Sequence, residues 1–145
     1  IIRRKQGLKK RIQMATIDCI KTIELPISEF KGGLLGVLEG PLVPHLISRF
    51  FFVTSSEGDI RGQHGHKACW QTLICLKGVI QLEMIDSNGD SLTELLDSSR
   101  RAVVIPPGIW AKQKSVEMEN ILVVLASDLY DPDDYFYDKP TKKHP

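Results

Sequence analysis

Residues 58–78 read GDIRGQHGHKACWQTLICLKG, and this stretch decides the fold of the chain. Its first glycine is followed after five residues by His-x-His, after four more by Gln71 and after another six by a second glycine. On a β-strand, His64 and His66 project from the same face because they lie two residues apart. We therefore expect both imidazoles to meet inside a β-barrel, with Gln71 reaching the same cavity.

Short apolar segments separated by turn signals surround this stretch, which is typical of an all-β sandwich or barrel. Lys77-Gly78 is short enough to form a hairpin, Asn88-Gly89 is a favoured turn pair, and VIQLEMI (79–85) alternates with a period of two. No window carries a helical apolar stripe with caps at both ends, so helix is expected only in short turns. We predict strands at residues 17–25, 34–39, 47–54, 72–76, 79–85, 92–95, 102–105 and 121–126.

The length of 145 residues predicts one domain, which we place at residues 14–138 with a C-terminal tail at 139–145. No apolar run approaches the roughly 20 residues of a membrane-spanning helix. Residues 1–13 lack the apolar core of a secretory signal, so we expect a cytoplasmic protein. The three cysteines form no CxxC pattern, which favours a reduced compartment and buried thiols.

Charge is distributed unevenly along the chain. Residues 1–13 contain six Lys/Arg and no acid, whereas the rest contains 13 Lys/Arg against 18 Asp/Glu, a net charge of −5. An acidic body disfavours nucleic acid as a partner. The basic leader is either a phosphate-binding or nucleic-acid-binding arm, or a solvated or disordered segment outside the folded domain that need not belong to the native chain.

The spacing of residues 58–78 resembles the first motif of the cupin superfamily, in which most metal-binding members carry glutamate at the position of Gln71. The second cupin motif has Pro-x-Gly, two residues and a ligand histidine, but here residues 106–108 (PPG) are followed after two residues by Ala111. Two histidines and a neutral amide give a weak, poorly specified metal site. We therefore predict a single cupin barrel of the jelly-roll type that holds no metal.

A closer resemblance is to the cupin-type sugar 3,4-ketoisomerases that act on TDP-4-keto-6-deoxyglucose. It implies that the chain moves a keto group from C4 to C3 through an enediol, without a cofactor. It also implies a homodimer that exchanges N-terminal strands, with residues 17–25 in the sheet of the partner. The motifs that carry this resemblance are RGQHGHK, QTLICLKG, IELPISEFKGGLLGVLEG, ISRFFFV, VVIPPGIW and ILVVLASDLYDPDDYFYD.

This resemblance implies catalytic roles for His64 and His66, because imidazole accepts and donates protons near neutral pH. The residues do not tell which histidine is the base and which is the acid. Gln71 can stabilise the developing enolate oxygen or be a buried amide that bonds to backbone. The remaining candidate substrate contacts are three cations for the diphosphate and one aromatic ring for stacking, namely Arg61, Arg49, Lys31 and Trp110.

Each of these four candidates also has an ordinary structural interpretation, as a surface charge or as a core or dimer contact. The chain also departs from the family at Phe52, where members often have tyrosine, at Gly65, where they have alanine, and at Lys31, where they have arginine. Two other functions stay open: a metal-free cupin that only binds a sugar, and a cupin epimerase of nucleotide sugars.

Overall fold

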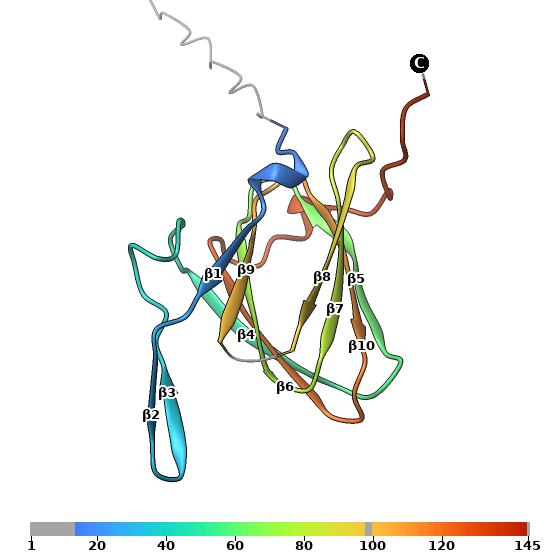
Figure 1. Cartoon of the computed structure of the whole chain (residues 1–145). Helices are drawn as coiled ribbons and strands as arrows, with labels where there is room; N and C mark the ends of the chain where they lie inside the picture. Colours follow the sequence, from blue (N-terminus) through green and yellow to red (C-terminus); the bar gives the residue numbers. More distant parts are fainter. Residues whose placement is uncertain (1–13, 98–99, 145) are drawn as a thin grey trace, which may run out of the picture.

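The protein is described here by a computed structural model that covers residues 14–97 and 100–144 (Figure 1). Within these residues the fold is almost entirely β, with twelve strands and two three-residue 3-10 helices. The basic leader predicted at residues 1–13 lies outside the described residues. In the described part of the chain, no helix is long and apolar enough to cross a membrane.

The elements follow one another along the chain with short connections. The first half contains η1 (Ile17–Cys19), β1 (Lys21–Glu24), β2 (Ile27–Phe30), β3 (Gly33–Gly36), β4 (Arg49–Ser55), β5 (Ile60–His66) and β6 (Gln71–Lys77). The second half contains β7 (Ile80–Ile85), β8 (Ser91–Leu96), β9 (Arg101–Ile105), β10 (Trp110–Ser115), β11 (Asn120–Ala126), η2 (Pro132–Asp134) and β12 (Tyr135–Phe136).

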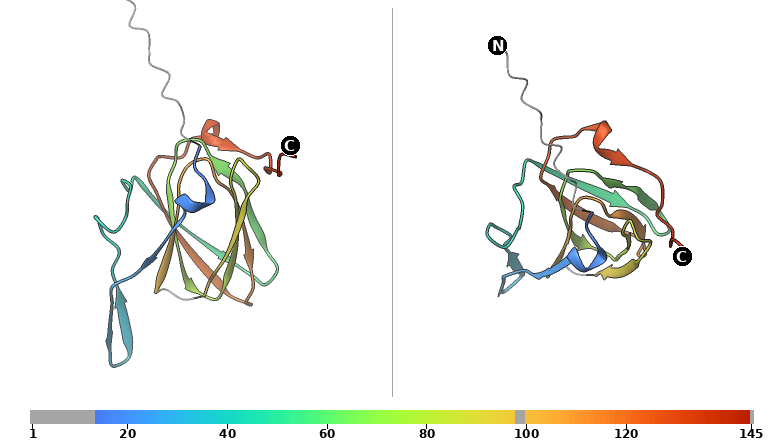
Figure 2. Two further views of the ribbon diagram at one scale, coloured as in Figure 1. Left: turned by 45° about the horizontal axis from the view of Figure 1, so that its top comes forward. Right: turned by 90° about the horizontal axis from the view of Figure 1, so that it is seen from above.

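Two five-stranded antiparallel sheets face each other and enclose the barrel (Figures 1 and 2). The first sheet has the strand order β1-β9-β6-β11-β4 and the second has the order β12-β5-β10-β7-β8. Strands β2 and β3 form a separate hairpin that projects away from the barrel (Figure 1). Because most consecutive strands from β4 to β11 alternate between the sheets, the predicted all-β jelly-roll barrel with little helix is confirmed.

Apolar side chains from both sheets fill the space between them. In β7, Ile80, Leu82 and Met84 point inward and are buried, whereas Gln81 is exposed, as the alternation in this strand predicts. The opposite sheet contributes inward residues from β6, β9 and β11. Its buried members of the same cluster are Leu73, Cys75, Val103, Ile105, Leu122 and Val124.

Several predicted features need correction. The predicted strand 17–25 begins instead with the 3-10 turn η1, because the buried Asp86 carboxylate accepts a hydrogen bond from the Ile17 N–H at 3.0 Å. Cys19 is exposed, not buried. The predicted strand ranges do not include β2, β5, β10 or β12, although we expect His64 and His66 to lie on a strand. In β10 the inward residues are Ala111 and Gln113, so the strand shows no apolar alternation.

The turn at Lys77-Gly78 also differs from the predicted hairpin. Strands β6 and β7 on its two sides belong to different sheets, so the turn carries the chain across the barrel. Gly78 has a φ of +77°, and a Cβ there would lie 2.3 Å from the Asn120 Oδ1. The turn pair Asn88-Gly89, by contrast, does connect two paired strands, β7 and β8.

Candidate active site

The two histidines of β5 meet inside the barrel, as the sequence predicts. The ring centroids of His64 and His66 lie 5.2 Å apart, edge to face. Both line a cavity of about 20 Å³, together with Gln71 from β6 and Gln113 from β10. Gln113 is a polar member of this cavity that the sequence does not reveal, because β10 is not recognisable as a strand.

An irregularity in β5 directs the imidazoles. Lys112 of β10 pairs with Gly62 and Ala111 with His64, so Gln63 is an extra residue on β5. Gly62 and Gln63 have φ values of +80° and +59°. A β-bulge of this kind twists the strand and changes the direction of the following side chains. A residue with a side chain does not fit at position 62, because its Cβ would lie 2.9 Å from the Ala111 carbonyl oxygen.

The two imidazoles have the same tautomer. The Nδ1 of His64 lies 3.0 Å from the carbonyl oxygen of Gly62, and the Nδ1 of His66 lies 2.9 Å from the Oδ2 of Asp134. Because a carbonyl or carboxylate oxygen only accepts, each Nδ1 carries the proton and each neutral ring has a free lone pair on Nε2. The Nε2 of His66 is buried and has no hydrogen-bond partner among the described residues.

Asp134 is another member of the site that the sequence analysis missed. Its Oδ1 accepts a hydrogen bond from the Ala68 N–H at 2.7 Å, and its Oδ2 accepts from the Cys69 N–H at 3.4 Å and from His66. The carboxylate side chain is only 11% exposed. The signal was available in DPDDYFYD (131–138), but this segment contains four aspartates and the sequence gives no means of choosing among them.

The electrostatic surroundings keep His66 neutral. Burial lowers the pKa of His66 below its ordinary value of 6.5, and the positive charges of His64 and Arg49 act in the same direction. The hydrogen bond and the negative charge of Asp134 oppose this shift without cancelling it. At neutral pH His66 therefore has an unprotonated Nε2 that faces a cavity, which is the state of a general base.

Three tyrosines from the C-terminal segment cover the histidines. The Tyr135 ring centroid lies 4.7 Å from that of His64 and 4.5 Å from that of His66. Tyr137 and Tyr130 lie farther out, at 6.2 Å and 6.0 Å from Tyr135. These rings wall one side of the site, and the sequence analysis assigned them no role.

Arg49 is the predicted cation that the structure places near the histidines. Its guanidinium lies 5.2 Å from the Phe51 ring centroid and 5.8 Å from the Tyr130 centroid. Its Nε is buried and has no hydrogen-bond partner among the described residues. A cation held between two rings with a spare donor can bind an anionic group.

The other predicted contacts do not line the cavity. Arg61 is exposed on β5, and Lys31 is exposed in the turn of the projecting hairpin (Figure 1). Trp110 is 3% exposed on the outer side of β10, where its Nε1 donates to the Tyr137 carbonyl oxygen at 3.2 Å. Phe52 is 64% exposed, on the outer face of β4, so the position of the family tyrosine also points away from this cavity.

One group of side chains in the described residues has the donor types of a metal site. Ligand atoms of His66, Cys69 and Asp134 lie within 4.8 Å of one another. These side chains already have hydrogen-bond partners. The carboxylate of Asp134 accepts from the His66 imidazole, and the Cys69 thiol donates to the Trp70 carbonyl oxygen at 3.3 Å. The set fits a hydrogen-bonded cluster better than a tetrahedral ion with three or four free ligands.

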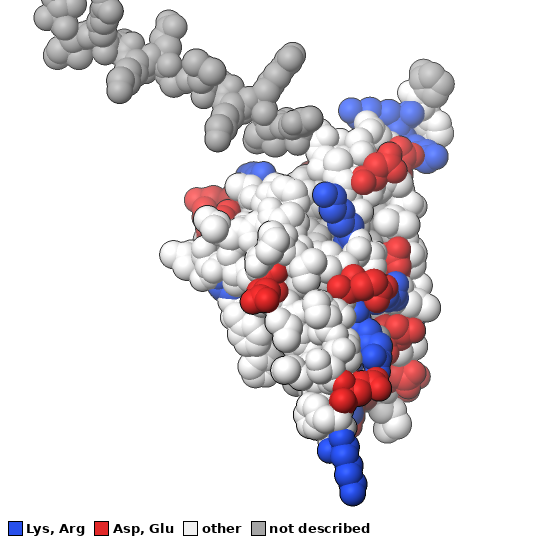
Figure 3. All heavy atoms as spheres, turned by 60° about the vertical axis from the view of Figure 1, so that its left-hand side comes forward, with Lys and Arg blue, Asp and Glu red and all other residues white. Residues whose placement is uncertain are grey.

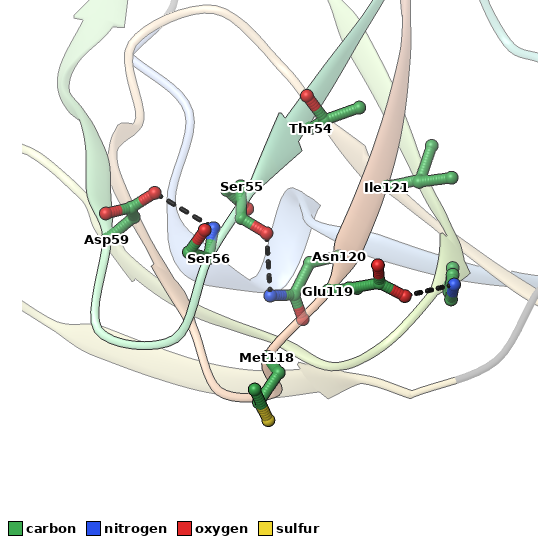
Figure 4. Close-up of a pocket in the computed structure, with 9 residues that line it drawn as sticks. Thr54, Ser55, Ser56, Asp59, Met118, Glu119, Asn120 and Ile121 are labelled. Atoms are coloured by element: carbon green, nitrogen blue, oxygen red, sulfur yellow. Dashed lines mark hydrogen bonds and ion pairs between the residues drawn. The ribbon is translucent and has the colours of Figure 1, made fainter.

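A larger hollow of about 360 Å³ lies at the opposite end of β5, beside the β4–β5 turn (Figure 4). Asn120 lines it and is 1% exposed. Its Nδ2 donates to the Ser55 and Glu117 carbonyl oxygens, and its Oδ1 accepts from the Val79 N–H at 3.0 Å. This amide closes the end of the barrel, and both of its polar atoms have partners among the described residues.

Comparisons with known proteins agree with the fold and identify a family for the chain. Residues 18–143 match the FdtA family, described as WxcM-like, C-terminal. The chain is 32% identical over 111 residues to a TDP-4-oxo-6-deoxy-alpha-D-glucose-3,4-oxoisomerase from Aneurinibacillus thermoaerophilus, which covers 75% of this chain and 78% of the relative.

Two solved structures are similar over most of their length. QdtA, a sugar 3,4-ketoisomerase from Thermoanaerobacterium thermosaccharolyticum in complex with TDP, has a TM-score of 0.77 and 28% identity, covering 82% of this chain and 88% of its own. The TDP-quinovose 3,4-ketoisomerase WlaRB from Campylobacter jejuni has a TM-score of 0.78 and 27% identity, covering 84% and 95%. The chain therefore belongs to the FdtA family, together with the sugar 3,4-ketoisomerases, and is an isomerase.

Proposed function

We propose that the chain moves the keto group of TDP-4-keto-6-deoxyglucose from C4 to C3 by histidine-mediated proton transfer through an enediol, without a metal. The relative from Aneurinibacillus is named for this reaction. A histidine-to-asparagine variant of QdtA has been solved in complex with TDP-4-keto-6-deoxyglucose. These names suggest the substrate, and the geometry around His66 suggests the chemistry.

The observation that carries the proposal is the unpartnered Nε2 of His66. A buried polar atom without a partner costs roughly 1–3 kcal/mol, so such an atom in a cavity indicates a role for a ligand. Asp134 fixes the proton on the opposite nitrogen, and His64 places a second imidazole beside the first. Two imidazoles on one cavity wall suit a reaction that removes one proton and returns another.

The proposed reaction balances within the sugar and the protein. A neutral imidazole takes the proton from C3, and the electron pair of that C–H bond forms the C3–C4 double bond of an enediolate as the carbonyl electrons move onto the C4 oxygen. The proton of the C3 hydroxyl passes to the C4 oxygen, and the C3 carbonyl forms as C4 takes a proton from a second, protonated imidazole. We assign the first step to His66 because its pKa is lowered and its Nε2 has no partner among the described residues, and we assign the proton donation to His64, acting in its protonated form. Exchange of protons with water then returns both rings to their starting states.

Other side chains would stabilise and hold the substrate. The amides of Gln71 and Gln113 line the same cavity and can donate hydrogen bonds to the enediolate oxygens. Arg49 is our candidate for the diphosphate, because its Nε is an unused donor and its guanidinium lies beside Tyr130. Arg61 and Lys31 lie outside the cavity. They can contact the substrate only if its nucleotide part extends beyond the cavity, or if they reach the site of a second chain in a dimer.

The cavity also predicts movement on binding. A volume of about 20 Å³ holds one water molecule, not a hexose. The segment that covers it leads from β11 to η2 and β12 and carries Tyr130 and Tyr135. We expect this segment to shift when the sugar enters, because it has no regular structure between Ser127 and Asp131.

The expectation of a metal-free reaction rests on the donor set. The positions of the remaining cupin ligands are held by Gln71 and Ala111, which leaves two histidines and a neutral amide. We expect turnover to survive dialysis against a strong chelator. Stoichiometric zinc, iron or manganese in the purified protein, with loss of activity on its removal and recovery on its return, would contradict this.

We also propose a homodimer in which N-terminal strands are exchanged. Within one chain, β1 pairs with β9, and the hairpin beyond it has exposed apolar residues, Phe30 and Leu35 among them. A hollow of about 360 Å³ separates this hairpin from the outer face of the first sheet, where Phe50 and Phe52 are exposed as well. The middle of this side of the molecule is largely uncharged, and acidic and basic side chains form a band along one edge (Figure 3).

Light scattering of the purified protein tests the dimer, which predicts twice the chain mass of 16.3 kDa. Exchange of the N-terminal strand further predicts that a disulfide engineered between β1 and β9 forms between chains. A monomer in solution would contradict the first claim, and a disulfide only within chains would contradict the second.

One experiment separates the candidate functions. The protein is incubated with TDP-4-keto-6-deoxyglucose in deuterated buffer, and the sugar signals are followed by NMR. Loss of the C3 proton signal together with a carbonyl at C3 supports the isomerase. Binding without exchange indicates a sugar-binding protein, and inversion at C5 indicates an epimerase; either result would overturn the proposal.

A further inference from the structure

The position of Asp134 depends on a short strand whose anchors lie outside the cavity. Asp134 is the last residue of η2, and β12 follows it immediately. β12 has only two residues, and Tyr135 pairs with His66 while Phe136 pairs with Gly65. A two-residue strand at the edge of a sheet has little stability of its own, so other contacts must hold it there.

The first anchor is the pairing of Phe136 with Gly65. A Cβ on Gly65 would lie 2.2 Å from the Phe136 ring and 2.5 Å from the Ile109 carbonyl oxygen, which no real Cβ tolerates. The absence of a side chain at Gly65 is therefore what lets the Phe136 ring lie directly on β5. This explains why the chain has glycine at the centre of RGQHGHK.

The second anchor is Trp110, which lies next to β5 on the neighbouring strand β10. Its buried indole donates from Nε1 to the carbonyl oxygen of Tyr137 at 3.2 Å, directly after β12. Lys139 then lies 5.2 Å from the centroid of the same indole and donates to the Glu83 carboxylate at 3.1 Å. The chain on the C-terminal side of Asp134 is thus attached at three successive points.

We propose that Gly65, Phe136 and Trp110 are positioning residues that seat β12 so that Asp134 keeps the proton of His66 on Nδ1. None of the three side chains lines the cavity, so they act on the reaction only through Asp134. A hydrogen bond between imidazole and carboxylate needs alignment to roughly 0.5 Å, which a displaced β12 would not maintain. The consequence for turnover rests on the proposed function, whereas the consequence for the tautomer does not.

The test uses Trp110→Phe, which keeps an aromatic ring and removes the indole donor. Nitrogen-15 NMR of the histidine side chains reports the tautomer of His66 directly. The native protein should show a protonated Nδ1 alone, and the variant should show a mixture that includes protonated Nε2, the form that imidazole adopts without a partner at Nδ1. We expect kcat to fall about tenfold with little change in KM, as for the loss of an orienting partner.

Three further variants complete the test. Phe136→Leu should give the same mixture, whereas Trp70→Phe, which removes the only other indole, should leave the tautomer unchanged. If Trp110→Phe unfolds, the tautomer of His66 is measured instead in Phe136→Leu and in Lys139→Met, which changes an exposed residue. A single Nδ1-protonated form of His66 in all folded variants would overturn the positioning proposal. A native protein that shows the predicted tautomer but no isomerisation would overturn the proposed function alone.

Discussion

The two ends of the barrel each bury a polar side chain, but they differ in whether all of its polar atoms have hydrogen-bond partners. Asn120 at one end satisfies both its amide nitrogen and its amide oxygen with backbone groups. His66 at the other end satisfies Nδ1 with a carboxylate and leaves Nε2 without a partner among the described residues. The larger hollow lies beside Asn120, at about 360 Å³ against about 20 Å³.

This contrast shows that unpaired buried atoms indicate a reactive site better than volume does. A satisfied amide such as that of Asn120 stabilises the fold, because each of its hydrogen bonds replaces one lost to water. The unpaired Nε2 of His66 and the unpaired Nε of Arg49 both lie at the end that Tyr130 and Tyr135 cover. The two ends should therefore respond differently to mutation, one in activity and the other in stability.

The largest effect should come from the histidines. We expect His66→Asn and His64→Asn each to lower kcat by about a hundredfold or more, the usual contribution of a general acid or base. The melting temperature should fall only modestly, because an asparagine at position 66 keeps an N–H donor for Asp134 and His66 Nε2 has no hydrogen-bond partner among the described residues. Steady-state kinetics and calorimetry check the two parts, and near-normal turnover in both variants would refute the assigned roles.

The next effect should come from Asp134. The Asp134→Asn variant keeps the size of the side chain but removes its charge and one of its two acceptor oxygens. The remaining oxygen cannot accept from both the Ala68 N–H and His66 Nδ1 in the present geometry, so the Nδ1 proton is held less firmly. We expect a loss of about tenfold to a hundredfold in kcat, by analogy with other carboxylates that orient a histidine. Asp133→Asn is the matched control, because the Asp133 side chain is exposed beside the same turn. Equal losses in both variants would contradict a specific role for Asp134.

At the opposite end, Asn120→Ala should reduce stability and spare the chemistry. The substitution leaves the Val79 N–H and the Ser55 and Glu117 carbonyls without their partner, which we expect to lower the free energy of unfolding by about 2–4 kcal/mol. Urea denaturation measures that change, while kcat per folded molecule stays close to the native value. A folded variant with lost turnover would break the proposed separation of the two ends.

The smallest effect is on the pH dependence. Since the pKa of His66 is lowered from 6.5, the base form persists below pH 6.5, and kcat/KM should decline only as pH falls toward the lowered value. Unfolded histidine titrates near pH 6.5, so the unfolded state binds a proton first and the free energy of unfolding decreases as pH falls below that point. A kcat/KM profile with its acid limb above pH 6.5 would contradict the neutral state of His66.

The sequence predicts the barrel and the location of the site because both depend on local patterns. Alternation in β7 and the spacing of His64, His66 and Gln71 survive in the structure as inward-facing side chains. Strand β10 is not predicted because its inward positions hold Ala111 and Gln113, neither of which is a large apolar residue, so the strand shows no apolar alternation. The Lys77-Gly78 turn does not form the predicted hairpin because β6 and β7 belong to different sheets. Which strands pair is set by the whole topology and not by the turn alone.

The partners of the site residues lie beyond such patterns. Asp134 is 68 residues from His66, and nothing local distinguishes it from Asp131 or Asp133. From the sequence, Trp110 is a candidate either for stacking on substrate or for a core or dimer contact. The structure shows that β10 turns its ring outward onto the C-terminal chain, where it is buried. Which face of a strand a side chain occupies next to a β-bulge is decided by pairing, and no local sequence pattern reveals it.

The most direct test of the account follows the carbonyl carbon of TDP-4-keto-6-deoxyglucose by carbon-13 NMR, with native protein that has been dialysed against a chelator. We predict that the carbonyl signal moves from C4 to C3 at the rate of the untreated protein. A signal that stays at C4, or one that moves only after a metal ion is restored, would contradict metal-free proton transfer by His64 and His66.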